Sequence, residues 1–244
     1  MTSARRSSAT RSPRKARRPK ASGVPQSSSP IGRRPRDHRR MHEATWSRAQ
    51  AEEILDSPER RRRQDPDRFW NAVGLKDGEV VVDVGAGSGF FSFPAARAVG
   101  PSGRVFAVDI SRELVEMVRE RCVELDLRNV QAVLSTQQRI PIEDAIADVV
   151  LLANVLHGLS PLTLDEAVRL LRPGGRLVDV DWKKTATEEG PPVAHRLSET
   201  EASRALSGRG LHRRRSFELG PSHYVLVFER PPPARHPRRL VSAE

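Results

Sequence analysis

Short apolar runs alternate with helix-period segments along most of the chain after residue 78. The runs are rich in Val, Leu, Ile and Ala, as is typical of strands that are buried on both faces of a parallel sheet. Alternation of such strands with helices predicts an α/β fold with crossover helices. Five parallel strands are predicted, at Val80–Val84, Val105–Ile110, Val130–Leu134, Ala147–Ala153 and Arg176–Val180.

The helix-period pattern is clearest over Ser111–Leu127, where Ser111 is suited to cap the first turn. Possible capping boxes at Thr163–Glu166 and Ser198–Glu201 predict two more helix starts. The apolar positions of the first helix recur three or four residues apart, at Leu114, Val115, Val118 and Cys122.

Further elements are predicted before and after the five parallel strands along the chain. Residues 44–78 are expected to form a helical segment that is interrupted by prolines. After the last helix, Ser216–Leu219 and His223–Phe228 flank a Gly220-Pro221 turn, which predicts an antiparallel hairpin. The whole pattern therefore predicts a mostly parallel seven-stranded sheet, with helices on both faces and a C-terminal antiparallel hairpin.

Charge divides the chain into unlike parts. Residues 1–40 hold 13 Lys and Arg against one acid, whereas the remainder holds 29 basic and 30 acidic residues. Residues 1–43, rich in Arg, Ser and Pro, are expected to be a disordered tail, and the Pro-rich residues 231–244 a second flexible tail. The folded domain is expected over residues 79–230.

The cysteine content and hydropathy narrow the class of protein. Cys122 is the single cysteine, which excludes a disulfide framework and a cysteine-based zinc site and favours the cytoplasm. The longest apolar stretch, near residues 149–156, is interrupted by Asn154 and is too short to cross a membrane. No metal site is predicted.

A glycine-rich loop follows the first strand, in the order Asp83-Val84-Gly85-Ala86-Gly87-Ser88-Gly89. Glycines there permit a tight turn and close backbone approach to a ligand, beside the unpaired N–H groups of a helix start. A nicotinamide dinucleotide motif would place glycine at position 90, where this chain has Phe90. A nicotinamide oxidoreductase is therefore disfavoured.

With Asp83 two residues before the first glycine, this loop resembles motif I of class I methyltransferases, which have a Rossmann-like fold. Leu170–Leu177 likewise resembles the turn into the fifth strand of that family. The resemblance implies S-adenosylmethionine as cofactor, with its methionine part held by Gly85, Ala86, Gly87 and Gly89 and its amino group near Asp83. It is nearest to the methyltransferase type 11 and ubiquinone/menaquinone methyltransferase-like group, which implies a small-molecule acceptor.

The second strand ends in Asp109, where a carboxylate is placed to accept hydrogen bonds from two ribose hydroxyls. Ile110 beside it is also expected to contact the cofactor. The family often has an acid after the third strand that touches adenine, but this chain has Ser135 and Thr136 there. We expect those residues to replace that contact.

Two residues after the fourth strand are candidates for contact with the reacting groups. Asn154 and His157 follow it at the rim where open α/β sheets bind ligands. Because the sulfonium is already activated, a base is needed only for an acceptor that arrives protonated. His157 is the candidate catalytic base, and closing the pocket is its alternative role; Asn154 is a candidate cofactor contact.

Basic residues raise the question of other partners. Three basic residues are candidates to bind an anionic acceptor: Lys183, Lys184 and Arg196. Alternatively, they form a solvated surface cluster. The runs Arg60–Arg63 and Arg213–Arg215 are read as solvated faces. A nucleic-acid or protein acceptor reached through the basic tail, and a catalytically inactive cofactor-binding module, remain alternatives.

The sequence also resembles one branch of that group around Leu55–Arg60. Members of the branch tend to begin near the equivalent of Met41, so translation is expected to start there and the upstream residues to be an artefact.

Overall fold

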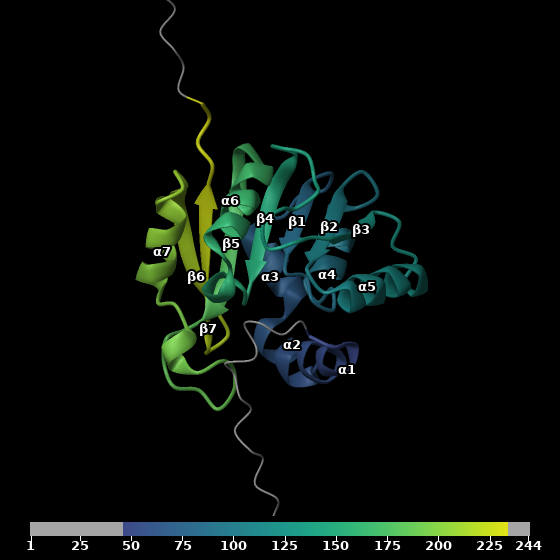
Figure 1. The fold of residues 1–244 in the computed structure, drawn as a ribbon, viewed down its shortest axis with the longest axis horizontal. Helices are drawn as coiled ribbons and strands as arrows, with labels where there is room; N and C mark the ends of the chain where they lie inside the picture. The colour runs from purple at the N-terminus through teal and green to yellow at the C-terminus, as the bar shows by residue number, and fades with distance from the viewer. Residues whose placement is uncertain (1–45, 234–244) are drawn as a thin grey trace, which may run out of the picture. The chain divides into compact units, whose positions relative to one another are not determined.

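A computed structural model describes residues 46–233. Within that range one sheet has the strand order β3-β2-β1-β4-β5-β7-β6, with β1 to β5 parallel and β7 antiparallel to β5 and β6 (Figure 1). The predicted fold class is confirmed. The strands are β1 Val80–Val84, β2 Arg104–Asp109, β3 Val130–Leu134, β4 Ala147–Ala153, β5 Leu171–Trp182, β6 His212–Leu219 and β7 His223–Glu229.

Helices precede the sheet and connect its strands. Those before it are α1 Arg48–Gln50, the π-helical turn η2 Ala51–Leu55, α2 Pro58–Gln64 and α3 Pro66–Val73. The connecting helices are α4 Ser92–Val99, α5 Arg112–Glu124, η3 Leu156–Gly158, α6 Pro161–Leu170, η4 Val193–His195 and α7 Glu199–Ser207. Apart from 231–233, the two predicted tails lie outside the described residues. In the described range no helix is long and apolar enough to cross a membrane.

Strand alternation sends neighbouring side chains into two cores. Val81 packs with residues of α3 and α4 on one face, and Val82 with residues of α6 and α7 on the other. Both valines are fully buried. Burial on both sides explains the nearly continuous apolar runs of β1 and β4.

Helix starts mostly follow the predicted caps. The Ser111 side chain caps α5, and Ser198 and Glu201 form a capping box at α7. The prediction of a capping box at Thr163–Glu166 is wrong, because α6 begins earlier and its cap is Ser160, whose hydroxyl accepts from the Thr163 N–H. The Glu166 carboxylate instead accepts from the Ile140 N–H at 2.8 Å.

Two strands begin several residues earlier than predicted, and β2 begins one residue earlier. β5 starts at Leu171, and residues 172–175, which contain the Pro-Gly-Gly turn, bulge out of its ladder with β4. β6 starts at His212 and takes in the run Arg213–Arg215. Because β6 is an edge strand exposed along most of its length, charged side chains do not prevent it from pairing with β7.

Residues 46–64, here named the cap segment, lie at the carboxyl ends of the parallel strands (Figure 1). The Ala51 side chain packs on Leu114 and Met117 of α5. At the other end, a Cβ on Gly220 of the β6–β7 turn would lie 2.6 Å from the Arg63 carbonyl oxygen. β1 and β4 are neighbours in the sheet, but the connections that follow them lead in opposite directions, to β2 and to β5. Open α/β sheets bind ligands at the carboxyl edge where this happens. The cap segment covers that part of the edge.

Candidate cofactor and acceptor site

The glycine loop turns directly over the end of β1. The N–H groups of Gly85 and Ala86 donate to the Val108 carbonyl at 2.8 and 2.9 Å. Gly85, Gly87 and Gly89 have φ of 77°, 58° and 84°, in the left-handed region that favours glycine. A Cβ on Gly85 would lie 2.7 Å from a methyl carbon of Val155, so the loop also needs glycine for close packing.

Asp83 is a buried carboxylate with one unused oxygen. Ser92 donates to its Oδ2 at 2.6 Å, while Oδ1 has no hydrogen-bond partner. Burial raises the pKa of Asp83 to about 6, against the opposing effects of the Ser92 hydrogen bond and the charge of Arg60. A buried acceptor of this kind is suited to a cationic donor supplied by a ligand.

Asp109 joins the glycine loop to the start of α5. Its Oδ2 accepts from the Gly87 N–H and its Oδ1 from the Ser111 N–H, both at 2.9 Å. Burial raises the pKa of Asp109, and these two hydrogen bonds oppose the rise. Each carboxylate oxygen keeps a second lone pair for ligand hydroxyls. Beside it, Ile110 is 45% exposed, an apolar surface open to a flat ring.

Ser135 and Thr136 follow β3 on the same edge. The Ser135 N–H donates to the Asp109 carbonyl at 2.9 Å, which places Ser135 beside the Asp109–Ile110 surface. The exposed Thr136 hydroxyl oxygen accepts from the N–H groups of Gln138 and Arg139, and so closes its own turn. Of the two, Ser135 lies nearer to the predicted cofactor residues.

Asn154 lies between the sheet and the cap segment. Its φ is 58°, a conformation that Asn adopts more readily than most residues. Its side-chain amide pairs reciprocally with that of the buried Gln64, at 3.3 and 3.4 Å. Sequence reasoning did not single out Gln64, whose only signal was its place in a charged helix.

The cap segment is fastened to the glycine loop by polar contacts. The Ser88 hydroxyl donates to Asp56 at 2.5 Å, and Arg121 of α5 donates to Asp56 at 2.7 Å and to the Ser88 carbonyl at 3.0 Å. The Arg60 guanidinium lies over the Phe90 ring, 4.2 Å from its centroid. The cap segment therefore covers the loop through side chains that the sequence patterns did not identify.

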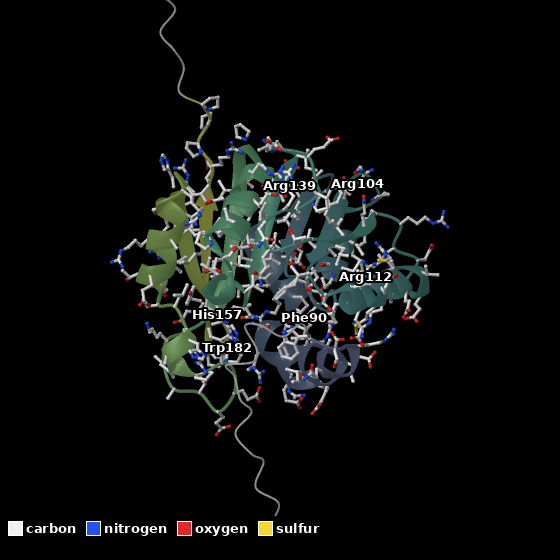
Figure 2. All side chains as sticks on the ribbon, in the orientation of Figure 1. Phe90, Arg104, Arg112, Arg139, His157 and Trp182 are labelled. Carbon is white, nitrogen blue, oxygen red and sulfur yellow. The ribbon has the colours of Figure 1, made fainter. Side chains whose placement is uncertain are left out.

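His157 follows β4 and meets a carboxylate from β5. Its Nδ1 lies 3.0 Å from Asp181 Oδ2, and the Trp182 N–H holds the other oxygen of Asp181 at 2.7 Å. The His157 side chain is 10% exposed and that of Asp181 is fully buried. Figure 2 shows His157, Trp182 and Phe90 along one edge of the sheet, next to the cap segment.

A second buried carboxylate, Asp179, lies two residues before Asp181 on the same face of β5. Neither of its oxygens has a hydrogen-bond partner. Burial, followed by the negative charge of Asp181, raises the pKa of Asp179 well above its ordinary range. Ionisation of Asp179 is therefore disfavoured at this position beside Asp181.

Arg196 organises the loop after β5 and is not a free cation for an acceptor. It is 2% exposed and donates to the carbonyl oxygens of four loop residues and to the Thr187 hydroxyl. Lys183 pairs with Glu218 and Lys184 with Glu201. The carbonyl acceptors are those of Lys183, Thr185, Glu189 and Pro191.

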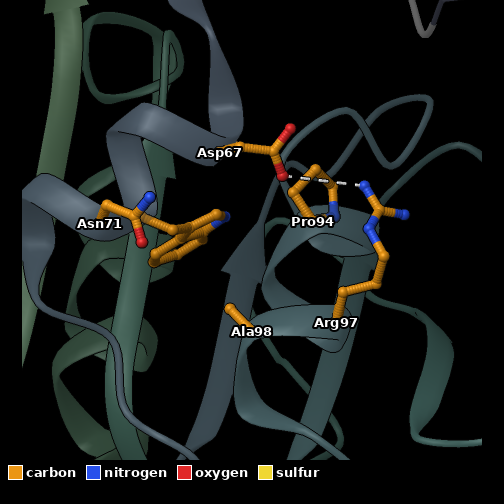
Figure 3. Close-up of a pocket in the computed structure, with 6 residues that line it drawn as sticks. Asp67, Asn71, Pro94, Arg97 and Ala98 are labelled. Atoms are coloured by element: carbon orange, nitrogen blue, oxygen red, sulfur yellow. Dashed lines mark ion pairs between the residues drawn. The ribbon is translucent and has the colours of Figure 1, made fainter.

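A pocket of about 460 Å³ opens beside this loop. It is lined by His157 and the residues that follow it, by η4 and its flanks, and by Lys184 and Glu201. A smaller hollow of about 230 Å³ lies between α3 and α4, where Asp67 and Arg97 approach to 3.9 Å (Figure 3). Because the smaller hollow is lined by none of the predicted site residues, the larger pocket is the candidate acceptor site.

The basic runs are engaged within the fold. Arg62 pairs with Glu59 and Arg63 with Glu189. Arg213 and Arg214 pair with acids, and Arg215 donates to the carbonyl oxygens of the last two residues of α3. Within residues 46–233, no group of three His, Cys, Asp or Glu is arranged to hold a metal ion.

Comparison with known proteins identifies the family. The sequence pattern described as "Methyltransferase domain" matches residues 75–209, more than half of the chain. This chain belongs to that methyltransferase family. The recognition made from the glycine loop is thereby confirmed.

Individual relatives are of two kinds. An arsenite methyltransferase of Halobacterium salinarum is 38% identical over 117 residues, covering 47% of this methyltransferase and 30% of that protein. A ubiquinone/menaquinone biosynthesis C-methyltransferase of Cellvibrio japonicus is 31% identical over 129 residues, covering 50% of this chain and 52% of that one. The chain therefore spans about half, or less, of the length of these relatives.

A solved structure extends the likeness over most of the chain. An S-adenosylmethionine-dependent methyltransferase from Aquifex aeolicus superposes with a TM-score of 0.71 at 32% identity, covering 75% of this methyltransferase and 98% of that chain. The cofactor of the family is S-adenosylmethionine.

The residues on the carboxyl edge fit this cofactor. The unpartnered Asp83 Oδ1 suits its ammonium group, the free lone pairs of Asp109 suit its ribose hydroxyls, and exposed Ile110 suits its adenine ring. When bound, S-adenosylmethionine supplies an electrophilic methyl group on a sulfonium. Sequence analysis missed Asp181 and Asp179, although two acids at alternate positions near the end of a buried strand were a usable signal.

Proposed function

We propose that this methyltransferase transfers the methyl group of S-adenosylmethionine to a small molecule bound in the pocket beside His157. The observation that carries the proposal is the pocket of about 460 Å³, lined by His157 at the end of β4. The same connection contributes Val155, which packs against Gly85 of the cofactor loop. One short segment therefore borders both the cofactor loop and the pocket, as an acceptor site requires.

The cofactor is assigned to Asp83, Gly85, Ala86, Gly87, Gly89, Asp109, Ile110 and Ser135, with Thr136 and Asn154 at its edge. His157 is assigned to the acceptor side. A small acceptor is favoured over nucleic acid because most arginines of the two basic runs are paired with acids or carbonyl groups.

The acceptors named for the relatives are not equally suited to this chain. Trivalent arsenic is a soft centre that thiolates bind. This chain has a single cysteine, Cys122, which is half-buried on α5 and does not line the pocket. An organic acceptor is therefore favoured over arsenite.

Calorimetric titration with S-adenosylmethionine tests the cofactor assignment. We expect the wild type to bind S-adenosylmethionine and not NADH. Asp109→Ala is expected to weaken binding about ten- to hundredfold, since it removes charge-assisted hydrogen bonds to the ligand. Glu124→Gln, an exposed acid at the end of the same α5, serves as the control and is expected to bind normally.

Absence of S-adenosylmethionine binding by the wild type would contradict the cofactor assignment, whereas binding without transfer to any acceptor would favour the inactive cofactor-binding module. Once binding is established, mass spectrometry with isotope-labelled methyl groups identifies which compounds accept the label. Label found only on nucleic acid or protein would overturn the small-molecule proposal.

A further inference from the structure

Three ionisable side chains form a row from the pocket into the core. His157 lines the pocket, Asp181 lies behind it, and Asp179 lies one step deeper along β5. Only His157 has measurable exposure, since Asp181 and Asp179 are both fully buried. The mechanism of methyl transfer from a sulfonium does not by itself require such a row.

The buried carboxylate of Asp181 fixes the orientation of His157. One Asp181 oxygen lies 3.0 Å from Nδ1, and the other accepts the Trp182 N–H, so the carboxylate cannot rotate without losing a hydrogen bond. An ionised carboxylate is only an acceptor, which requires the proton of a neutral His157 to be on Nδ1. In that tautomer Nε2 carries the ring lone pair that can accept a proton.

Three neighbouring side chains surround Asp181. Burial and the charge of Asp181 both raise the pKa of Asp179, on the same face of β5, and so oppose its ionisation. The buried Arg196 is attracted to Asp181 from the loop above. Tyr224, opposite Asp181 on β7, stays neutral because burial raises its pKa.

We propose that Asp181 positions His157 as a general base, and that the acceptor is a small molecule with a phenol- or enol-type hydroxyl whose proton His157 accepts. This inference rests on the proposed function and names its substrate class. The acceptor O–H bond breaks and its proton moves to Nε2. The electron pair left on the acceptor forms the bond to the methyl carbon, and the pair of the breaking carbon–sulfur bond stays on sulfur.

The nitrogen chemical shifts of the His157 ring test the positioning step in the full chain without any acceptor. We expect Nδ1 to be protonated and Nε2 to be unprotonated in the neutral ring of the wild type. In Asp181→Asn the tautomer with the proton on Nε2 should become more populated. Asp179→Asn should leave the tautomer unchanged, because neither Asp179 oxygen makes a hydrogen bond to the His157 ring. A wild-type ring with unprotonated Nδ1 would overturn the proposal.

Turnover tests the base. A panel of phenols and enols, together with alkenes that lack a hydroxyl, is incubated with methyl-labelled S-adenosylmethionine. We expect label on hydroxyl-bearing compounds, and His157→Gln to lower kcat about a hundredfold or more with KM changed less than about threefold. Asp181→Asn should lower kcat at least about tenfold.

Asp165→Asn, an exposed acid of α6 that pairs with Arg209, is the matched control and should keep the wild-type rate. Labelling of alkenes alone, or full activity of His157→Gln, would refute the base assignment. Calorimetry separates the two proposals. Absence of S-adenosylmethionine binding by the wild type would contradict the proposed function. If Asp181→Asn binds S-adenosylmethionine normally and its kcat is unchanged, only this inference is contradicted.

Discussion

At the scale of single residues, buried acids define the candidate site. Asp109 accepts from Gly87 of the glycine loop, Asp83 accepts from Ser92 at the start of α4, and Asp181 contacts His157 of the candidate acceptor pocket. Each is held by at least one donor from a neighbouring element, so its position is set by tertiary packing. The sequence identified Asp83 and Asp109 because both stand next to recognisable strand ends.

The pH dependence of cofactor binding should follow Asp83. Its pKa in the folded protein is about 6, raised by burial above an unfolded value near 3.9. Since a cationic ligand group favours the ionised carboxylate, affinity for S-adenosylmethionine should fall as the pH is lowered through about 6. Asp109 contributes in the same direction, because burial raises its pKa too.

Calorimetry from about one pH unit below to about two units above the pKa of Asp83 measures this effect. Asp83→Asn should bind more weakly and show a flatter pH profile. The sign for stability is opposite: a raised folded pKa means that the Asp83 contribution to the free energy of unfolding is lost as pH rises from about 4 to about 6. A steep profile in Asp83→Asn would assign the dependence to another group.

At the scale of elements, the loop between β5 and α7 depends on one buried side chain. Arg196 donates five hydrogen bonds to this loop, four of them to backbone carbonyl oxygens. Its guanidinium also lies 5.0 Å from the centroid of the Trp182 ring. The loop that forms one wall of the pocket is therefore ordered from within by a residue that the sequence suggested for acceptor binding.

Replacing Arg196 should act mainly by disordering the loop that forms this wall of the pocket. Arg196→Met is expected to reduce the free energy of unfolding by about 1–3 kcal/mol, because buried carbonyl groups lose their donors. Amide hydrogen exchange should accelerate over residues 183–197 and remain unchanged in β1. Arg204→Met, an exposed arginine of α7, is the control and should change neither quantity. Unchanged exchange in Arg196→Met would show that other contacts order the loop.

The cap segment illustrates how elements distant in sequence complete the site. Asp56, Arg60 and Gln64 contact Ser88, Phe90 and Asn154, respectively. A Cβ on Gly87 would lie 2.9 Å from a Leu55 methyl carbon, so the cap segment and the glycine loop pack with no spare space.

At the scale of the whole molecule, charge is concentrated outside the methyltransferase domain. Residues 1–40 carry 13 of the 42 Lys and Arg residues and one acid, while the rest of the chain is close to neutral. Electrostatic attachment to nucleic acid depends on such clustered cations and weakens with salt.

A chain that begins at Met41 should lose this attachment and keep cofactor binding. We expect the full chain to bind a DNA duplex with an affinity that falls at least about tenfold between 50 and 200 mM salt. The shortened chain should bind the duplex little and S-adenosylmethionine with unchanged affinity. Fluorescence anisotropy and calorimetry measure the two. Equal duplex binding by both chains would instead support a nucleic-acid acceptor.

The sequence by itself determined the architecture and the cofactor loop of this protein. All seven strands were predicted, because burial on both faces leaves continuous apolar runs and because glycine is required at the tight turn after β1. Strand ends were less well predicted where pairing overrides local preference, as in β6, whose arginines extend along an exposed edge.

Only the tertiary structure decided which polar groups meet. The contacts of His157 with Asp181, of Asn154 with Gln64 and of Asp56 with Ser88 join residues from separate elements. No local pattern encodes such contacts, because they depend on strand order, on the path of the cap segment and on which face of β5 each acid occupies. For the same reason, the structure and not the sequence showed that Arg196 donates its hydrogen bonds to its own loop.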